Sequence, residues 1–169
     1  MNFSQIYTTD MFIQGLRSFY IPGLTCTINE MLAPFRGRCP FRQYIPSKPT
    51  KCSIKIWWLC KAETFYSYNG QVHCGRLPQK QHEIGQSKHV VLDLCQPLFN
   101  TGRNICADDF FMGMELLTEL KQNQLSYLGT VKRNNLMVKA VCGHSRPTTA
   151  FVIVQSYQQC NTRVLYRKT

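Results

Sequence analysis

The sequence predicts a mixed α/β domain, and three observations indicate this class. Asn69-Gly70, a strong signal for a tight β-hairpin, lies between two short runs of strand-forming residues. Further along, two stretches with apolar residues at helical spacing alternate with two short β-type runs. The chain has 169 residues and is 44% hydrophobic, which is enough to bury one core, so a single domain is expected.

A short helix is expected near the start of the chain. Thr8, Thr9 and Asp10 are residue types that cap helix N-termini. Apolar residues follow at helical spacing, and their stripe is predicted to face the core: Phe12, Leu16 and Phe19. Pro22-Gly23 should end the helix.

An antiparallel meander is predicted to follow this helix. Its expected strands span residues 24–28, 53–60, 64–68 and 71–74, and the last two flank the Asn69-Gly70 turn. Trp57 and Trp58 are adjacent, so a strand directs one to each face of the sheet. For both tryptophans we expect a packing role rather than base stacking.

Two helices and two strands are expected after the meander. Ser87 can cap the first helix, whose apolar face consists of Val90, Val91, Leu94 and Leu98. A short buried-type run spans 104–107, and then Asp108 or Asp109 can cap the second helix. The apolar stripe of that helix consists of Phe110, Met114, Leu117 and Leu120. With a strand at 126–132, the order meander, helix, strand, helix, strand is that of a ribonuclease-H-like domain.

A basic segment separates the first two predicted strands. Between Met31 and Ala62 lie seven basic residues and no acidic one: Arg36, Arg38, Arg42, Lys48, Lys51, Lys55 and Lys61. Aromatic side chains and four prolines are interleaved with them, and the whole chain has a net charge of +11. This combination suits a DNA phosphate backbone, which we expect to be bound without sequence preference. The alternative is a solvated basic face. The residues predicted to bind DNA are Arg36, Arg38, Arg42, Lys48 and Lys51.

The same segment resembles a known family. FRGRCPFRQYIPSKPTKCSIKIWW is similar to a motif of piggyBac-type transposases that reads roughly FRGRCPFRxYxPxKPxKYGIKI. TINE, directly before it, resembles the TxDE that carries the family's first catalytic aspartate. Asn69-Gly70, GRNICADDFF and YLGTVKRN resemble further landmarks in the same order. The resemblance covers about residues 11–134 and implies a ribonuclease-H-like catalytic fold, a nuclear location and DNA as partner.

The resemblance also implies a two-metal site that this chain does not complete. The family uses three aspartates to hold Mg²⁺. At the first of these positions this chain has Asn29 in place of aspartate, so the position is degenerate. Asp108 matches the second position. The third aspartate lies downstream in the family, but residues 120–169 contain no Asp or Glu. Glu30 neighbours Asn29, yet successive strand residues point to opposite faces, so we expect no replacement by it. We therefore predict that the chain binds no metal ion or other cofactor.

Other function classes are disfavoured by spacing and hydropathy. Nine cysteines occur without any CxxC pair, which argues against structural zinc and favours reduced thiols. No apolar run has the ~18 residues that a membrane span needs, and no signal peptide is recognised, so a soluble intracellular protein is expected.

The predicted organisation is a truncated transposase-like domain at 1–134 followed by a divergent basic tail at 135–169. Residues 151–154 suit either a paired strand or an exposed β-prone segment. The predicted function is that of a catalytically inactive, transposase-derived protein that binds DNA through the basic segment. The alternative is a protein-interaction remnant or a non-functional fragment. Nothing in the sequence indicates an oligomeric state.

Overall fold

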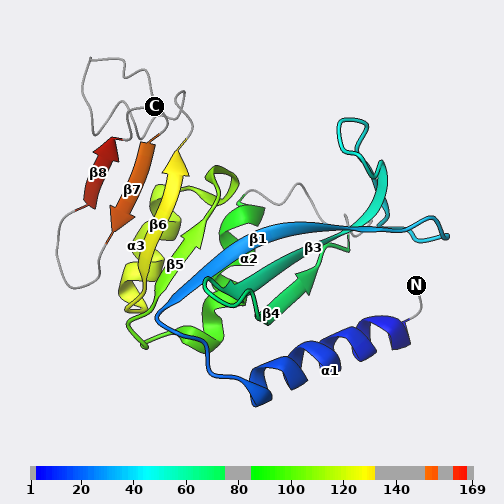
Figure 1. The fold of residues 1–169 in the computed structure, drawn as a ribbon, viewed down its shortest axis with the longest axis horizontal. Coiled ribbons are helices and arrows are strands. Elements are labelled where there is room, and N and C mark those ends of the chain that lie inside the picture. The colour runs from blue at the N-terminus through cyan, green and yellow to red at the C-terminus, as the bar shows by residue number, and fades with distance from the viewer. Residues whose placement is uncertain (1–2, 75–84, 132–150, 156–161, 167–169) are drawn as a thin grey trace.

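A computed structural model of the chain describes residues 3–74, 85–131, 151–155 and 162–166. One mixed sheet and the helices beside it make up these residues (Figure 1). The elements are α1 (Phe3–Phe19), β1 (Thr25–Pro34), β2 (Gln43–Tyr44), β3 (Cys52–Lys61), β4 (Ser67–Val72), α2 (Gln86–Cys95), η1 (Gln96–Leu98), β5 (Asn104–Ala107), η2 (Asp109–Phe111), α3 (Met114–Gln122), β6 (Ser126–Val131), β7 (Phe151–Gln155) and β8 (Thr162–Tyr166).

The sheet combines antiparallel and parallel pairing. Its order is β2-β3-β1-β5-β6-β7-β8, and β4 also pairs with β3. β3 is antiparallel to β1 and β4, whereas β1, β5 and β6 are parallel neighbours. The mixed α/β class predicted from the sequence is confirmed.

The core lies on one face of this sheet, where α2 and α3 pack behind the strands in the view of Figure 1. Trp57 and Ile28 of the sheet are buried there together with Val91, Leu94 and Leu120 of the helices. Asn69 of β4 reaches the same layer, where its Nδ2 donates a hydrogen bond to the carbonyl oxygen of Leu94 at 2.8 Å. The apolar face predicted for the first helix after the meander, which corresponds to α2, is confirmed.

The Asn69-Gly70 pair is not the hairpin turn that the sequence predicted, because both residues lie inside β4. The turn comes earlier, where the Phe65 N–H donates to the carbonyl oxygen of Lys61 and Phe65 adopts a φ of 57°. Gly70 serves a different purpose. A Cβ there would lie 2.5 Å from ring atoms of Trp58, so the missing side chain lets that indole lie flat on β4. Trp57 and Trp58 thus point to opposite faces, as predicted.

The helix α1 differs from its prediction in both extent and orientation. It begins at Phe3, well before the expected cap at Thr8, Thr9 and Asp10. Phe12 and Phe19 are 61% and 85% exposed, so the predicted stripe does not face the core. Ile13, one residue further round the helix, is buried instead, and the Tyr66 hydroxyl donates to the carbonyl oxygen of Leu16 at 2.9 Å. α1 therefore packs beside β4 through a neighbouring face.

The helix caps also differ from the sequence prediction. Gly85 and Gly113 precede α2 and α3, and neither helix has a side-chain cap, so Ser87 is not the cap. Asp108 caps only the short turn η2, which contains Phe110 and ends before α3 begins. Phe110 and Met114 are consequently exposed, while Leu116 joins Leu117 and Leu120 in the core.

The region assigned to the basic tail contributes two strands to the sheet. β7 pairs with β6, with Leu128 opposite Val154, and β8 pairs with β7. Of the two alternatives for residues 151–154, the paired strand is confirmed. The division of the chain at residue 134 stays a prediction. Within the part of the chain that the structure describes, no helix is long and apolar enough to span a membrane.

Two glycine substitutions are predicted to change stability in opposite directions. Gly70→Ala forces a methyl group into the Trp58 ring and should lower the free energy of unfolding by about 1–3 kcal/mol. Gly15→Ala is the matched control, since a Cβ there meets nothing within 4 Å. Within helix α1 that change should raise stability by about 0.5–1 kcal/mol. Urea unfolding measures both, and a neutral Gly70→Ala would contradict this packing.

Candidate nucleic-acid interface

The two positions that the family resemblance singled out lie side by side. The parallel pairing of β1 with β5 ends at Ile28 opposite Ala107, so the next residues are Asn29 and Asp108. Ile28 is fully buried against the helices, whereas Asn29 and Asp108 are exposed. Because strand residues alternate, Asn29 lies on the face opposite the core. In Figure 1 no described helix lies in front of this part of the sheet.

The carboxylate of Asp108 is already engaged in a local contact. Its Oδ1 accepts a hydrogen bond from the backbone N–H of Asp109 at 2.6 Å, which makes Asp108 the cap of η2. Asn29 contributes a neutral amide beside it. Within the described ranges, no group of three or more His, Cys, Asp or Glu side chains is placed to hold a metal ion. One carboxylate and one amide do not fit a Mg²⁺ pair, which needs several anionic oxygens.

Glu30 points away from Asn29, toward the face that carries the core. Its Oε2 lies 2.5 Å from the ammonium of Lys55. That ammonium also lies 5.1 Å from the ring centres of both Trp57 and Phe110. Cation–π contacts of this kind are favourable, and more so when the cation is shielded from water. Lys55 is therefore held in place and is not a free DNA contact.

His73 belongs to the same cluster. Its ring stacks edge-on against Trp57 at a centroid distance of 5.0 Å. Partial burial lowers the pKa of His73, and the positive charge of Lys55 lowers it further, while Glu30 acts in the opposite direction. The folded protein thus favours neutral His73.

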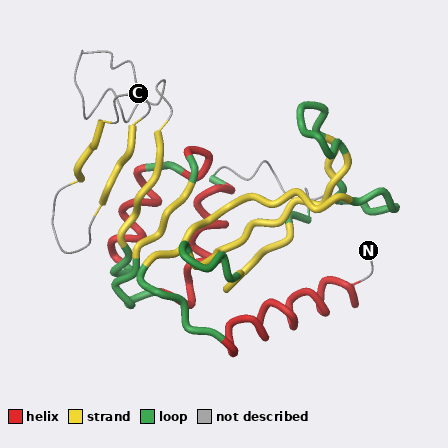
Figure 2. The backbone as a smooth tube through the Cα atoms, in the orientation of Figure 1, coloured by secondary structure: helices red, strands yellow, loops and turns green. Residues whose placement is uncertain are grey.

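The basic segment forms a two-lobed projection at the end of the β1–β3 pair (Figures 1 and 2). We call residues 35–51 the basic fork. Its first lobe spans 35–42 and its second spans 45–51, and β2 lies between them. β2 is paired to the start of β3, with Tyr44 opposite Cys52. The second lobe closes where the Ile45 N–H donates to the carbonyl oxygen of Lys51 at 2.8 Å.

Two side chains explain why the first lobe holds its shape. Phe41 is only 6% exposed and anchors the lobe. The Nη1 atom of Arg42 donates to the carbonyl oxygens of Arg36 and Gly37, at 3.3 and 3.1 Å. Arg42 thus braces the loop, a role that its basic character did not suggest. The positive charge of Arg42 predicted a phosphate contact. The sequence signal for a local role was Gly37, five residues earlier, because glycine is typical of turns.

Within the part of the chain whose side chains the structure describes, exposed positive charge is concentrated in the fork. Among residues 8–74 and 85–130, whose exposure the structure describes, the exposed basic side chains are those of Arg36, Arg38, Arg42, Lys48 and Lys51. Elsewhere several cations have partners. Lys61 lies 3.1 Å from Glu63, and the Arg103 guanidinium donates to the carbonyl oxygens of Pro22 and Gly23. All five predicted DNA-binding residues therefore lie together on one projection.

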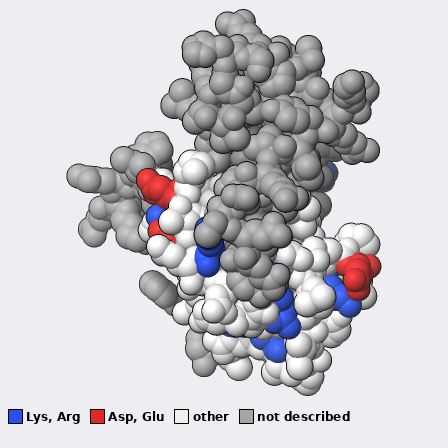
Figure 3. Space-filling view, turned by 90° about the vertical axis from the view of Figure 1, so that its left-hand side faces the viewer, with Lys and Arg blue, Asp and Glu red and all other residues white. Residues whose placement is uncertain are grey.

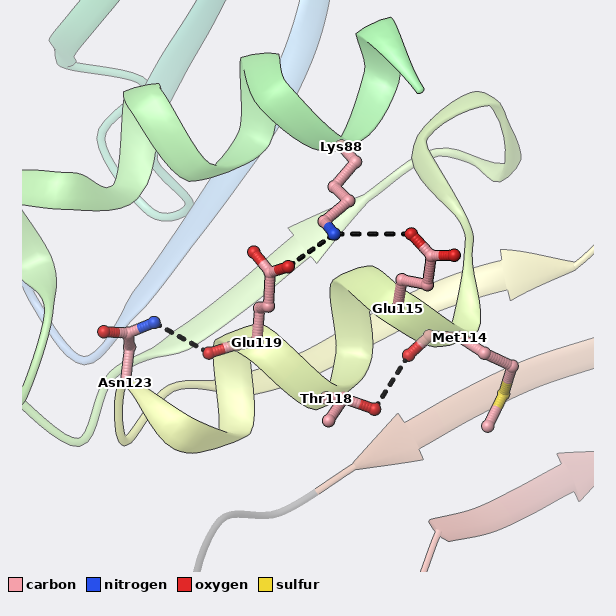
Figure 4. Close-up of polar contacts among 6 residues, drawn as sticks. All are labelled: Lys88, Met114, Glu115, Thr118, Glu119 and Asn123. Atoms are coloured by element: carbon pink, nitrogen blue, oxygen red, sulfur yellow. Dashed lines mark hydrogen bonds and ion pairs between the residues drawn. The ribbon is translucent and has the colours of Figure 1, made fainter. Parts of the chain in front are cut away.

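The opposite end of the molecule has a different charge distribution. Figure 3 shows scattered basic side chains there, with acidic ones close to some of them. Figure 4 shows one such group, in which Lys88 of α2 bridges Glu115 and Glu119 of α3. A hollow of about 310 Å³ lies beside it, where α2 and α3 begin. Because Lys88 is neutralised by two carboxylates, this hollow offers little attraction to a phosphate.

A family model and a solved structure are similar to this chain. A family model described as Transposase IS4 matches residues 4–164. A piggyBac transposase, solved as a synaptic complex with hairpin DNA, superposes with a TM-score of 0.74 at 32% sequence identity. The chain belongs to the IS4/piggyBac-type transposase family. The predicted resemblance to piggyBac-type transposases is thereby confirmed.

The extent of the match differs from that of the recognised motifs. The similarity covers 94% of this chain but only 35% of the solved piggyBac transposase. The family model also continues to residue 164, beyond the motifs that end at Asn134. The strands β7 and most of β8 lie within that additional match.

The His73 cluster predicts a pH-dependent loss of stability. The unfolded chain takes up a proton at His73 near pH ~6.5, whereas the folded chain does so only at a lower pH. Between these two pKa values the unfolded state binds more protons, so stability falls as the pH falls. His73→Gln should make the decline in unfolding free energy between about pH 7.5 and 5 shallower. An unchanged decline in urea titrations would contradict this assignment.

Proposed function

We propose that this protein is a catalytically inactive derivative of a piggyBac-type transposase that binds DNA through the basic fork. Arg36, Arg38, Lys48 and Lys51 contact the phosphate backbone, and Arg42 keeps the first lobe in shape. The observation that carries the proposal is that, among residues 8–74 and 85–130, the exposed Lys and Arg side chains are gathered on this single projection. A projecting, one-signed surface attracts a polyanion more strongly than the same charges spread over a body.

The fold supports this proposal at the level of topology. We propose that the strands β4-β3-β1-β5-β6 form the core of a ribonuclease-H-like domain. The first three are antiparallel and the last three are parallel, which keeps the predicted order of meander, helix, strand, helix, strand. The solved relative was captured with DNA, which supports DNA as the partner. A nuclear location follows from the same proposal.

Loss of catalysis is inferred from the residues beside the sheet. Asn29 replaces a carboxylate, and the carboxylate of Asp108 caps η2. Residues 120–169 contain neither Asp nor Glu, so they supply no third acidic ligand. These three facts support a protein that keeps a DNA-binding surface without strand-transfer chemistry.

A second candidate function rests on the exposed face of α1. Met11, Phe12 and Phe19 are 56%, 61% and 85% exposed, and clustered exposed apolar side chains are typical of protein contacts. This observation favours the alternative of a protein-interaction remnant. Absence of salt-dependent DNA binding would favour it over the first proposal.

DNA binding should depend steeply on salt. If about four fork cations neutralise phosphates, affinity for duplex DNA should fall on the order of 100-fold between roughly 50 and 200 mM salt. Sequence preference should be small, because phosphate contacts carry no sequence information. Fluorescence anisotropy with two unrelated duplexes measures both properties.

Two double variants of equal charge separate the fork from general positive charge. Arg36→Gln with Arg38→Gln removes two fork cations, and Arg17→Gln with Lys121→Gln removes two cations from α1 and α3. The fork variant should bind more weakly and make the slope of log affinity against log salt shallower by about 1.8. Equal effects of the two variants would mean that binding is diffuse and that the fork is not the interface.

Catalysis should be absent even when the first acidic position is restored. With Mg²⁺ or Mn²⁺, neither the natural protein nor Asn29→Asp should nick or join DNA, since a third carboxylate is still lacking. Gel analysis of labelled duplexes detects both reactions. Metal-dependent cleavage that disappears on Asp108→Ala would overturn the proposed inactivity.

A further inference from the structure

One aromatic side chain stands at the junction of the two lobes of the fork. Tyr44 is 64% exposed, although its backbone is fixed in β2. The pairs Gln43 with Ser53 and Tyr44 with Cys52 attach β2 to β3. Ser53 is fully buried, so the support beneath Tyr44 belongs to the packed part of the sheet. The ring is therefore presented to solvent from a defined position rather than from a loose loop.

The three aromatic residues of the fork have different roles. Phe41 is buried and anchors the first lobe. The Phe35 ring is half-buried and packs so closely over Gly37 that a Cβ there would lie 2.7 Å from it. Tyr44 has no ring-stacking or cation–π contact among the described residues. Two aromatic rings thus build the fork, and the third is left at its surface.

The surroundings of Tyr44 distinguish it from other exposed aromatic residues. Phe65 is 79% exposed and Phe19 is 85% exposed, but they lie in the β3–β4 turn and at the end of α1. The exposed Lys and Arg side chains of residues 8–74 and 85–130 lie in the two lobes on either side of Tyr44. An aromatic platform between phosphate-binding cations is the combination by which proteins hold unpaired bases.

We propose that Tyr44 stacks on an unpaired base while the lobes hold the flanking phosphates, so that the fork prefers DNA containing unpaired nucleotides to continuous duplex. This inference rests on the proposed DNA binding and specifies its substrate. In a continuous duplex each internal base is stacked between its neighbours and offers no free face to a protein ring. An unpaired base offers such a face, whatever its identity, so the preference is structural rather than sequence-specific.

The test compares a continuous duplex with the same duplex carrying a short central bubble, at one salt concentration, by fluorescence anisotropy. The protein should bind the bubble about tenfold more tightly, as one stacked base allows. Tyr44→Ala should remove this preference and leave duplex affinity nearly unchanged, whereas Tyr44→Phe should retain it because the ring is kept. Phe65→Ala is the matched control, an exposed ring outside the fork, and should behave like the natural protein.

A second measurement locates the contact directly. Photocrosslinking of a bubble that carries 5-iodouracil should attach the base to the peptide containing Tyr44. Equal affinity for duplex and bubble, or a preference that survives Tyr44→Ala, would overturn the stacking role. In that case a salt-dependent, fork-dependent duplex affinity would still uphold the proposed function. Failure to bind either DNA would overturn both proposals.

Discussion

The double role of β1 is the constraint on which the arrangement depends. Its first residues pair in parallel with β5, up to Ile28 opposite Ala107, while the whole strand pairs with β3 as far as Pro34 opposite Ser53. β5 ends at Ala107, so among the described strands the second half of β1 is paired with β3 alone. One strand thus places Asn29 beside Asp108 and, a few residues later, carries the basic fork away from the body (Figure 2).

Charged side chains are arranged differently in the body of the sheet and in the basic fork. In the body, Lys55 is held by Glu30, and Lys88 is held by two glutamates, so these cations have little net attraction for an anion. In the fork, the first lobe is stabilised by Phe41 and by the Arg42 contacts with backbone carbonyls, and Arg36 and Arg38 remain exposed. A preordered loop loses less conformational entropy on binding than a flexible one. The proposed loss of catalysis concerns Asn29 of the sheet, which lies outside this loop.

Sequence patterns predicted the class of the fold better than its details. The strand 104–107 and the apolar face of α2 follow directly from short-range patterns, because burial there matches local propensity. The Asn69-Gly70 pair gave a wrong turn prediction because both residues serve tertiary contacts. The Asn69 side chain bonds to Leu94, and Gly70, which has no side chain, leaves room for the Trp58 ring. Phe12 and Phe19 also misled, since spacing alone does not determine which side of a helix meets the sheet.

At the candidate interface, the sequence located the charges but not their roles. One-signed composition marked the fork, whereas the bracing by Arg42 depends on how the first lobe folds back on itself. The account is tested most directly by hydrogen–deuterium exchange of the whole chain, with and without duplex DNA at low salt. It predicts that DNA slows exchange mainly within residues 35–51, and that added salt reverses this protection. Slowed exchange centred on α2 and α3, with the fork unchanged, would contradict it.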